Sequence, residues 1–121
     1  MESRTIALHG GGDLVIGGGP PIDGVLHGWI EQEGKSFAFM LDHGKARELA
    51  DALRTRASAR IRTFTGHVQV SHTRGLACLW FYPWGEPTPE LGVRIYDAAI
   101  DVAAEAVSEV VSEGEVLPWA A

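Results

Sequence analysis

The chain of 121 residues has little of what marks secreted or membrane proteins. Its single cysteine, Cys78, excludes an intrachain disulfide framework. No apolar run approaches the roughly 20 residues that a membrane-spanning helix needs. The start lacks the basic segment and following apolar stretch of a signal peptide. These absences predict a cytoplasmic protein that does not bind a membrane.

Signatures of metal, cofactor and catalytic sites are also missing. The sequence contains no zinc-type cysteine pair, no H-E-x-x-H and no phosphate-binding G-x-x-x-x-G-K-[ST]. His67 and His72 are five residues apart and would face opposite sides of a regular strand. We therefore expect no metal and no cofactor. An enzyme using some of His27, His67, His72 and Asp42 ranks last, because no set of nucleophile, base and orienting group is visible.

Basic residues are absent from one long C-terminal stretch. Five carboxylates occur there at a strict four-residue spacing, with no Lys or Arg among them: Asp97, Asp101, Glu105, Glu109 and Glu113. On a helix they form one acidic ridge, and like charges so placed repel by about 0.2–0.5 kcal/mol per pair. Each step of four residues overshoots a full turn by about 40°. The ridge therefore winds, and its central part, Asp101 to Glu109, is the part expected to meet a partner.

The charges are unevenly distributed along the chain, whose net charge is −6. Residues 1–42 hold six acids and two bases, residues 43–74 two acids and seven bases, and residues 75–121 eight acids and one base. The basic part contains a cluster of arginines: Arg54, Arg56, Arg60, Arg62 and Arg74. Such a chain can complement itself, pair with a second copy in a homodimer, or offer a charged surface to a partner.

Hydrophobic periodicity predicts a single α+β domain over residues 1–121. Period-two patterns and glycine-rich turns indicate strands over residues 5–8, 14–16, 24–33, 36–41, 76–82 and 91–96. Residues 61–72 resemble one strand bent near Gly66. Asp42 is the expected N-cap of a helix to about Ala57. A second helix, carrying the acidic ridge, is expected to end at Gly114.

Strands joined by short turns imply antiparallel pairing. The expected fold is one antiparallel sheet of about five to seven strands, with two helices packed on one face. A faint strand–strand–helix pattern in each half suggests a duplication, and the tail 114–121 is expected either to dock or to fray.

The aromatic residues are concentrated in the stretch from Trp80 to Trp84. On a strand, Trp80 and Tyr82 share one face and Phe81 faces the other way. We expect these three rings to lie in the core. Trp84 follows Pro83 on a loop, where a large aromatic residue either covers the core or anchors a contact.

Three functions remain open. The leading hypothesis is a small non-enzymatic protein-binding domain, of inhibitor, immunity or chaperone type, whose acidic helix and Trp84 engage a basic partner surface. The first alternative is nucleic-acid or nucleotide binding through the arginines of residues 54–74; it ranks lower because nucleic-acid-binding domains usually have a stronger basic balance. The second alternative is a small enzyme with a histidine-containing site.

Overall fold

The computed structural model describes residues 3–17 and 24–115, with side chains described as far as residue 112. The first half of the chain contains β1 (Arg4–Ala7), β2 (Asp13–Ile16), β3 (Val25–Gln32), β4 (Lys35–Asp42) and α1 (His43–Thr55). The second half contains β5 (Ala59–Arg62), β6 (Gly66–Thr73), β7 (Leu76–Pro83), β8 (Leu91–Tyr96) and α2 (Asp97–Glu115). Within this part of the chain neither helix is long and apolar enough to cross a membrane.

The strands form two antiparallel sheets of four strands, in the orders β1-β2-β3-β4 and β5-β6-β7-β8. The expected α+β class is confirmed, but the expected single sheet of five to seven strands is wrong. Helix α1 separates the two series of hairpins, and the chain that follows it does not pair with β4 as a strand. Phe64 instead donates its backbone N–H to the carbonyl oxygen of Met40 at 3.1 Å. This contact joins a turn, and not a strand, to the edge of the first sheet.

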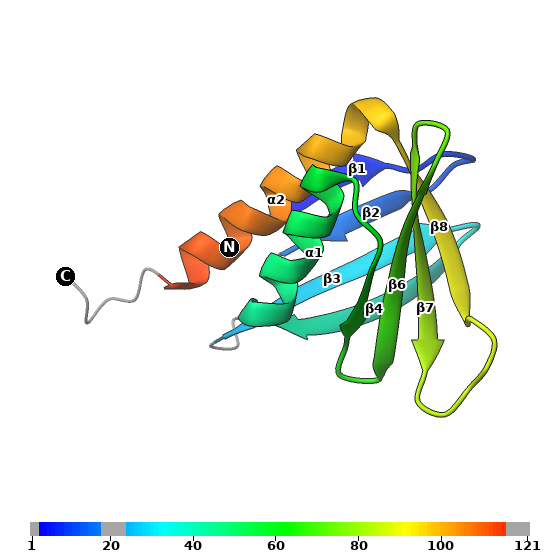
Figure 1. Ribbon diagram of the computed structural model, residues 1–121, viewed down its shortest axis with the longest axis horizontal. Coiled ribbons are helices and arrows are strands. Elements are labelled where there is room, and N and C mark those ends of the chain that lie inside the picture. The colour runs from blue at the N-terminus through cyan, green and yellow to red at the C-terminus, as the bar shows by residue number, and fades with distance from the viewer. Residues whose placement is uncertain (1–2, 18–23, 116–121) are drawn as a thin grey trace.

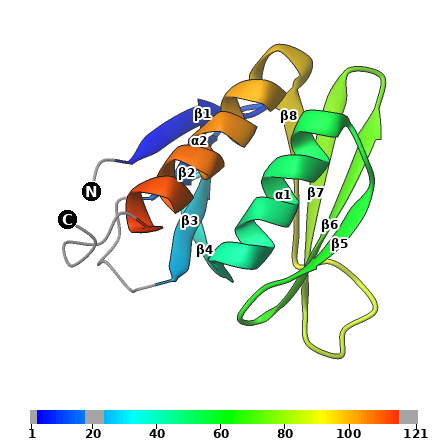
Figure 2. The same ribbon diagram turned by 60° about the vertical axis from the view of Figure 1, so that its left-hand side comes forward.

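In the described residues, each half of the chain contributes four strands followed by a helix. The two helices lie side by side in both views (Figures 1 and 2), and they contact one another. Helix α1 packs against β3 and β4 of its own half and against β5 and β6 of the other. Helix α2 packs against β7 and β8 and also against β1, β2 and β3. Each helix therefore holds the two sheets together.

The hydrophobic core lies between the helices and the inner faces of both sheets. Because side chains alternate along a strand, every second residue points inward. The largest fully buried side chains come from both halves: Ile16, Leu26, Ile30, Leu41, Leu53, Ile61, Leu79, Ile95 and Ile100. The rings of Phe39 and Phe81 lie 5.0 Å apart between centroids, which joins the first sheet to the second.

Helix α1 begins where the sequence predicts. The side chain of Asp42 accepts a hydrogen bond from the backbone N–H of Lys45 at 2.8 Å, which satisfies one of the free donors at a helix N-terminus. The helix ends at Thr55, two residues before the expected Ala57. Arg56 takes a left-handed conformation there, with φ 56°, and its backbone N–H bonds back to the last turn.

Two boundaries in the second half differ from expectation. Residues 61–72 are not one bent strand: Thr63 donates its N–H to the carbonyl oxygen of Gly66 at 2.9 Å, and this tight turn separates β5 from β6. The ridge-bearing helix α2 continues past Gly114 to Glu115. Residues 116–121, most of the expected tail, lie outside the described residues.

Candidate functional site

The acidic ridge on α2 is paired with arginines from two different directions. Arg56, just after α1, lies 2.8 Å from a carboxylate oxygen of Asp101 and 3.6 Å from one of Asp97. Arg4, on β1, lies 3.2 Å from a carboxylate oxygen of Glu109. The winding of the ridge explains this arrangement, because its first half turns toward α1 and its later part turns toward β1.

These ion pairs offset part of the repulsion along α2. The hydrogen bond from Arg56 is the main cause that lowers the pKa of Asp101, and the same bond raises the pKa of Arg56. Both groups are exposed, so each pair stabilises the fold only modestly. Among the described side chains, Glu105 has no basic partner; the side chain of Glu113 lies outside them. Arginines of the same chain therefore supply part of the positive charge that the sequence suggested a binding partner would have to provide. Binding of a protein through the ridge stays a prediction.

The arginines of residues 54–74 do not form one cluster. At the end of α1, Arg54 and Arg56 turn toward α2. Arg74 lies in the turn between β6 and β7. Arg60 and Arg62 alternate with the buried Ile61 on β5 and are exposed, so they lie on the outer face of the second sheet.

Trp80 lies at the centre of this outer face. One row across the sheet runs from Arg60 on β5 through Gln69 on β6 to Trp80 on β7 and Gly92 on β8. A Cβ atom on Gly92 would lie 2.4 Å from ring carbons of Trp80. The absence of a side chain at Gly92 therefore lets the indole lie against β8.

The next row, toward the β5–β6 turn, contains Arg62, His67 and Tyr82. The rings of His67 and Tyr82 are stacked, with centroids 4.6 Å apart and planes 7° from parallel. The guanidinium of Arg62 lies 5.4 Å from the ring centroid of Trp84, a cation–π distance. Trp84 follows β7, and 56% of its surface remains exposed.

Six residues of this surface define what we call the basic aromatic face: Arg60, Arg62, His67, Trp80, Tyr82 and Trp84. Lys45 of α1 joins several of them in lining a hollow of about 390 Å³ at the β5–β6 end of the sheet. Among the described residues no carboxylate pairs with Arg60 or Arg62. The pKa of His67 is lowered, first by partial burial and then by the positive charge of Arg60.

The outer face of the first sheet provides a contrast. Trp29 lies in the row formed with Thr5, Val15 and Ala38, and it donates its Nε1–H to Glu31 at 3.1 Å. Glu31 in turn is directly opposite Asp13 on β2. These rows contain an indole, as on the second sheet, but their charged groups are acidic.

The histidines proposed for an enzyme site are dispersed. His27 is on the first sheet, whereas His72 and His67 are on alternate faces of β6, and Asp42 is occupied as the helix cap. His72 Nε2 lies 3.1 Å from the carbonyl oxygen of Ala57. No group of His, Cys, Asp or Glu side chains in the described ranges is arranged to hold a metal ion.

Sequence reasoning missed the central residues of the basic aromatic face. It placed Trp80, Phe81 and Tyr82 in the core, but only Phe81 is buried there, whereas Trp80 and Tyr82 are half-buried on the outer side. The alternation was the available signal: Trp80 and Tyr82 share a face of β7, and Arg60 and Arg62 have the same two-residue spacing on β5, two strands away. Comparison with protein-family models, with curated protein sequences and with solved structures gave no match.

Proposed function

We propose that the protein binds single-stranded nucleic acid on the basic aromatic face. The observation that carries the proposal is the interleaving of rings and guanidinium groups on one exposed sheet surface. Arg62 lies over Trp84, and His67 stacks on Tyr82 in the same row of the sheet. Nucleic acid offers the complementary alternation of flat bases and phosphates.

The rings supply the base-binding part. Stacking of an unpaired base on an aromatic side chain contributes about 1–3 kcal/mol, and it tolerates any base because each has a π-face. Trp84 is more than half exposed and Trp80 and Tyr82 are half-buried, so all three present accessible ring surface. In a duplex the faces of the bases are covered by their neighbours, so we expect single strands to bind better than double strands.

The arginines supply the phosphate-binding part. Arg60 and Arg62 carry charges that no described carboxylate neutralises, whereas Lys45, which lines the same hollow, is paired with Glu48 at 3.0 Å. Arg94 extends the positive charge along β8, since it lies opposite Cys78 in a further row. If the protein contacts about three phosphates, the logarithm of the affinity should fall as the logarithm of the salt concentration rises, with a slope of about −2.

The protein's net charge of −6 opposes binding at long range. The acids of α2 are on a different part of the fold, and screening shortens their reach to about 10 Å at moderate salt. We therefore expect local binding by the face to survive the unfavourable total charge.

A nucleotide is the second candidate ligand. The hollow of about 390 Å³ is lined by Lys45, Arg60, Arg62 and His67, which suits the phosphates of one nucleotide. A mononucleotide that competes as well as an oligonucleotide would favour this reading, because the rings beyond the hollow would then contribute nothing.

The test is fluorescence anisotropy with a labelled oligothymidine of about 12 nucleotides, beside a duplex of equal length and a mononucleotide competitor. Two variants remove the binding chemistry: Trp80→Leu, and the double change Arg60→Gln with Arg62→Gln. We expect each to weaken binding by about tenfold or more.

Two matched controls separate this face from general effects. Trp29→Leu removes the equivalent indole from the first sheet, and Arg74→Gln removes one charge from the opposite end of the second sheet. Both should leave affinity nearly unchanged. Absence of wild-type binding at low salt, equal binding of the duplex, or equal losses in variants and controls would refute the proposal.

The earlier expectations of a cytoplasmic location, an inhibitor-type role and a homodimer stay predictions. Light scattering across a range of protein concentrations tests the homodimer directly.

A further inference from the structure

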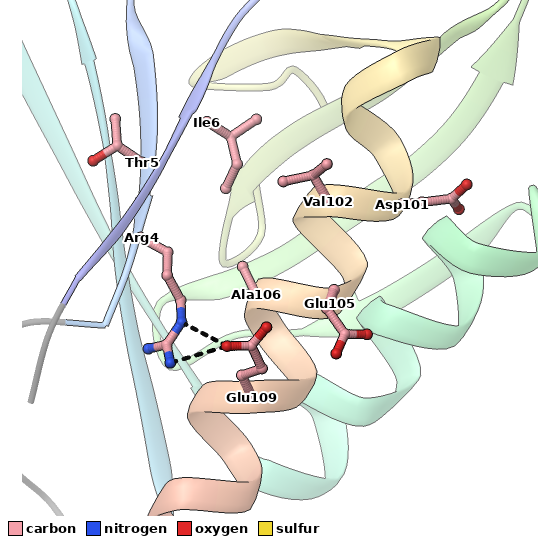
Figure 3. Close-up of a pocket in the computed structure, with 8 residues that line it drawn as sticks. All are labelled: Arg4, Thr5, Ile6, Asp101, Val102, Glu105, Ala106 and Glu109. Carbon is pink, nitrogen blue, oxygen red and sulfur yellow. Dashed lines mark hydrogen bonds and ion pairs between the residues drawn. The ribbon is translucent and has the colours of Figure 1, made fainter.

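A groove lies between strand β1 and helix α2 (Figure 3), and none of the residues that line it belongs to the basic aromatic face. Its volume is about 640 Å³. One side is formed by Arg4, Thr5 and Ile6, and the other by α2, from which Val102 and Ala106 contribute apolar surface. Val102 is 58% exposed, although it lies between the carboxylates of the ridge. An exposed valine beside a groove is apolar surface available to a ligand.

The strand side of the groove is a sheet edge. Strand β1 pairs with β2 and is the first strand of its sheet. Half of the backbone N–H and C=O groups of an edge strand point away from its neighbour, and no strand in the described residues pairs with this outer side of β1. An extended peptide is the ligand that satisfies such groups, because it adds as a further strand.

The helix side of the groove defines the charge of that peptide. Arg56 neutralises Asp101 at one end, and Arg4 neutralises Glu109 at the other. Glu105 lies between them on the groove wall, and within residues 3–17 and 24–112 no basic side chain pairs with it. Among the described residues, the carboxylates on either side of Glu105 are thus paired with a cation and Glu105 itself is not.

We propose that this groove binds an extended basic segment of a partner protein. The segment pairs with the outer edge of β1, places an apolar side chain on Val102 and places a Lys or Arg against Glu105. With Asp101 and Glu109 paired to arginines, the charge that remains on the groove wall is the carboxylate of Glu105, which repels an anionic ligand such as nucleic acid.

The test uses a labelled peptide of about six residues that alternates valine and lysine. Binding is measured by fluorescence anisotropy at low and moderate salt. Two further peptides vary one property each: one has glutamate in place of lysine, and one carries backbone N-methyl groups that prevent strand pairing. We expect the first peptide to bind and both others to fail.

Glu105→Lys is the decisive variant, and Glu86→Lys, the same charge change on the loop after β7, is its control. We expect Glu105→Lys to lower the affinity for the lysine peptide by about tenfold and to raise the affinity for the glutamate peptide. Glu86→Lys should do neither. Val102→Asp should also lower the affinity for the lysine peptide. Thermal unfolding of each variant checks that the fold persists.

Several outcomes would overturn the inference. If the N-methylated peptide binds equally, the ligand does not add as a strand. If both charge variants weaken binding equally, only the net charge matters. If light scattering shows a dimer that Val102→Asp dissociates, a second copy of the chain occupies the groove. Failure of oligothymidine binding, by contrast, leaves this inference intact, because none of the groove residues belongs to the basic aromatic face.

Discussion

The guanidinium of Arg62 lies 5.4 Å from the ring centroid of Trp84. Both residues are exposed, yet the backbone of Trp84 is fixed, because its N–H donates to the carbonyl oxygen of Thr65 at 3.1 Å. This bond attaches the loop after β7 to the β5–β6 turn. An exposed indole held in a defined position loses little conformational freedom when a ligand stacks on it.

Replacing Trp84 with alanine is expected to weaken oligothymidine binding by about 1–3 kcal/mol, the contribution of one stacked base. Stability should change little, because 56% of the side chain is already exposed. Anisotropy titration and thermal unfolding measure the two effects. A loss of stability larger than the loss of affinity would show that Trp84 covers the core instead.

The pH dependence of binding should report on His67. Burial and Arg60 lower its pKa below the ordinary value of 6.5, and a phosphate bound nearby would raise it. Binding then takes up a proton, so affinity should rise as pH falls through the pKa of the complex and level off below that of the free protein. Titration of oligothymidine, whose bases do not protonate there, measures this slope. His67→Gln should flatten it, and an unchanged slope would place the phosphate elsewhere.

The ion pair of Arg56 and Asp101 should make the stability of the protein depend on pH in acid. Because the hydrogen bond from Arg56 lowers the pKa of Asp101 below 3.8, the contribution is present above that ordinary value. It is lost as pH falls through the lowered pKa of the folded state. Urea midpoints between about pH 4 and pH 2 should therefore fall less steeply in Arg56→Gln than in the wild type. Arg74→Gln is the control and should keep the wild-type slope.

The contribution of the N-cap of α1 to stability should also be measurable by urea unfolding. Asp42 accepts a hydrogen bond from Lys45 N–H, and its replacement by alanine should lower the free energy of unfolding by about 1 kcal/mol. Asp42→Asn retains a side-chain acceptor and should cost less. Urea unfolding at neutral pH compares the three proteins, and equal stability of all three would contradict the assigned cap.

Alanine substitutions at two glycines that lie beneath aromatic rings should distinguish an effect on stability from an effect on oligothymidine binding. In Gly92→Ala the new methyl group would displace the half-buried Trp80, whereas in Gly28→Ala it would meet the ring of the buried Phe39. Gly28→Ala should lower the free energy of unfolding by about 1–3 kcal/mol and leave affinity unchanged. Gly92→Ala should mainly weaken oligothymidine binding. The reverse pattern would mean that the position of Trp80 does not matter for binding.

The local elements of this fold follow from short-range chemistry that is visible in the sequence. The apolar spacing and the cap at Asp42 specify α1, and the hairpin turn at Arg74 and Gly75 uses two residues with positive φ. The alternation on β7 likewise determines that Trp80 and Tyr82 share a face. Each of these signals acts between residues only a few positions apart, so the chain encodes them without reference to its final fold.

Tertiary structure decided the rest. The sequence indicates most of the described strands, although it joins β5 and β6 into one, and it does not say that α1 divides the strands between two sheets. The exposed side of Trp80 likewise depends on which face the helices cover. The arginines that pair with the acidic ridge are also far from it in the sequence. Arg4 and Glu109 are 105 residues apart, and Arg56 and Asp101 are 45 residues apart. Charge complementarity has no fixed spacing along the chain, whereas helical and strand periods do. The sequence by itself therefore determined most of the elements and which residues share a face. The packing of the two halves decided which face is covered, which charges are neutralised and which remain available for a ligand.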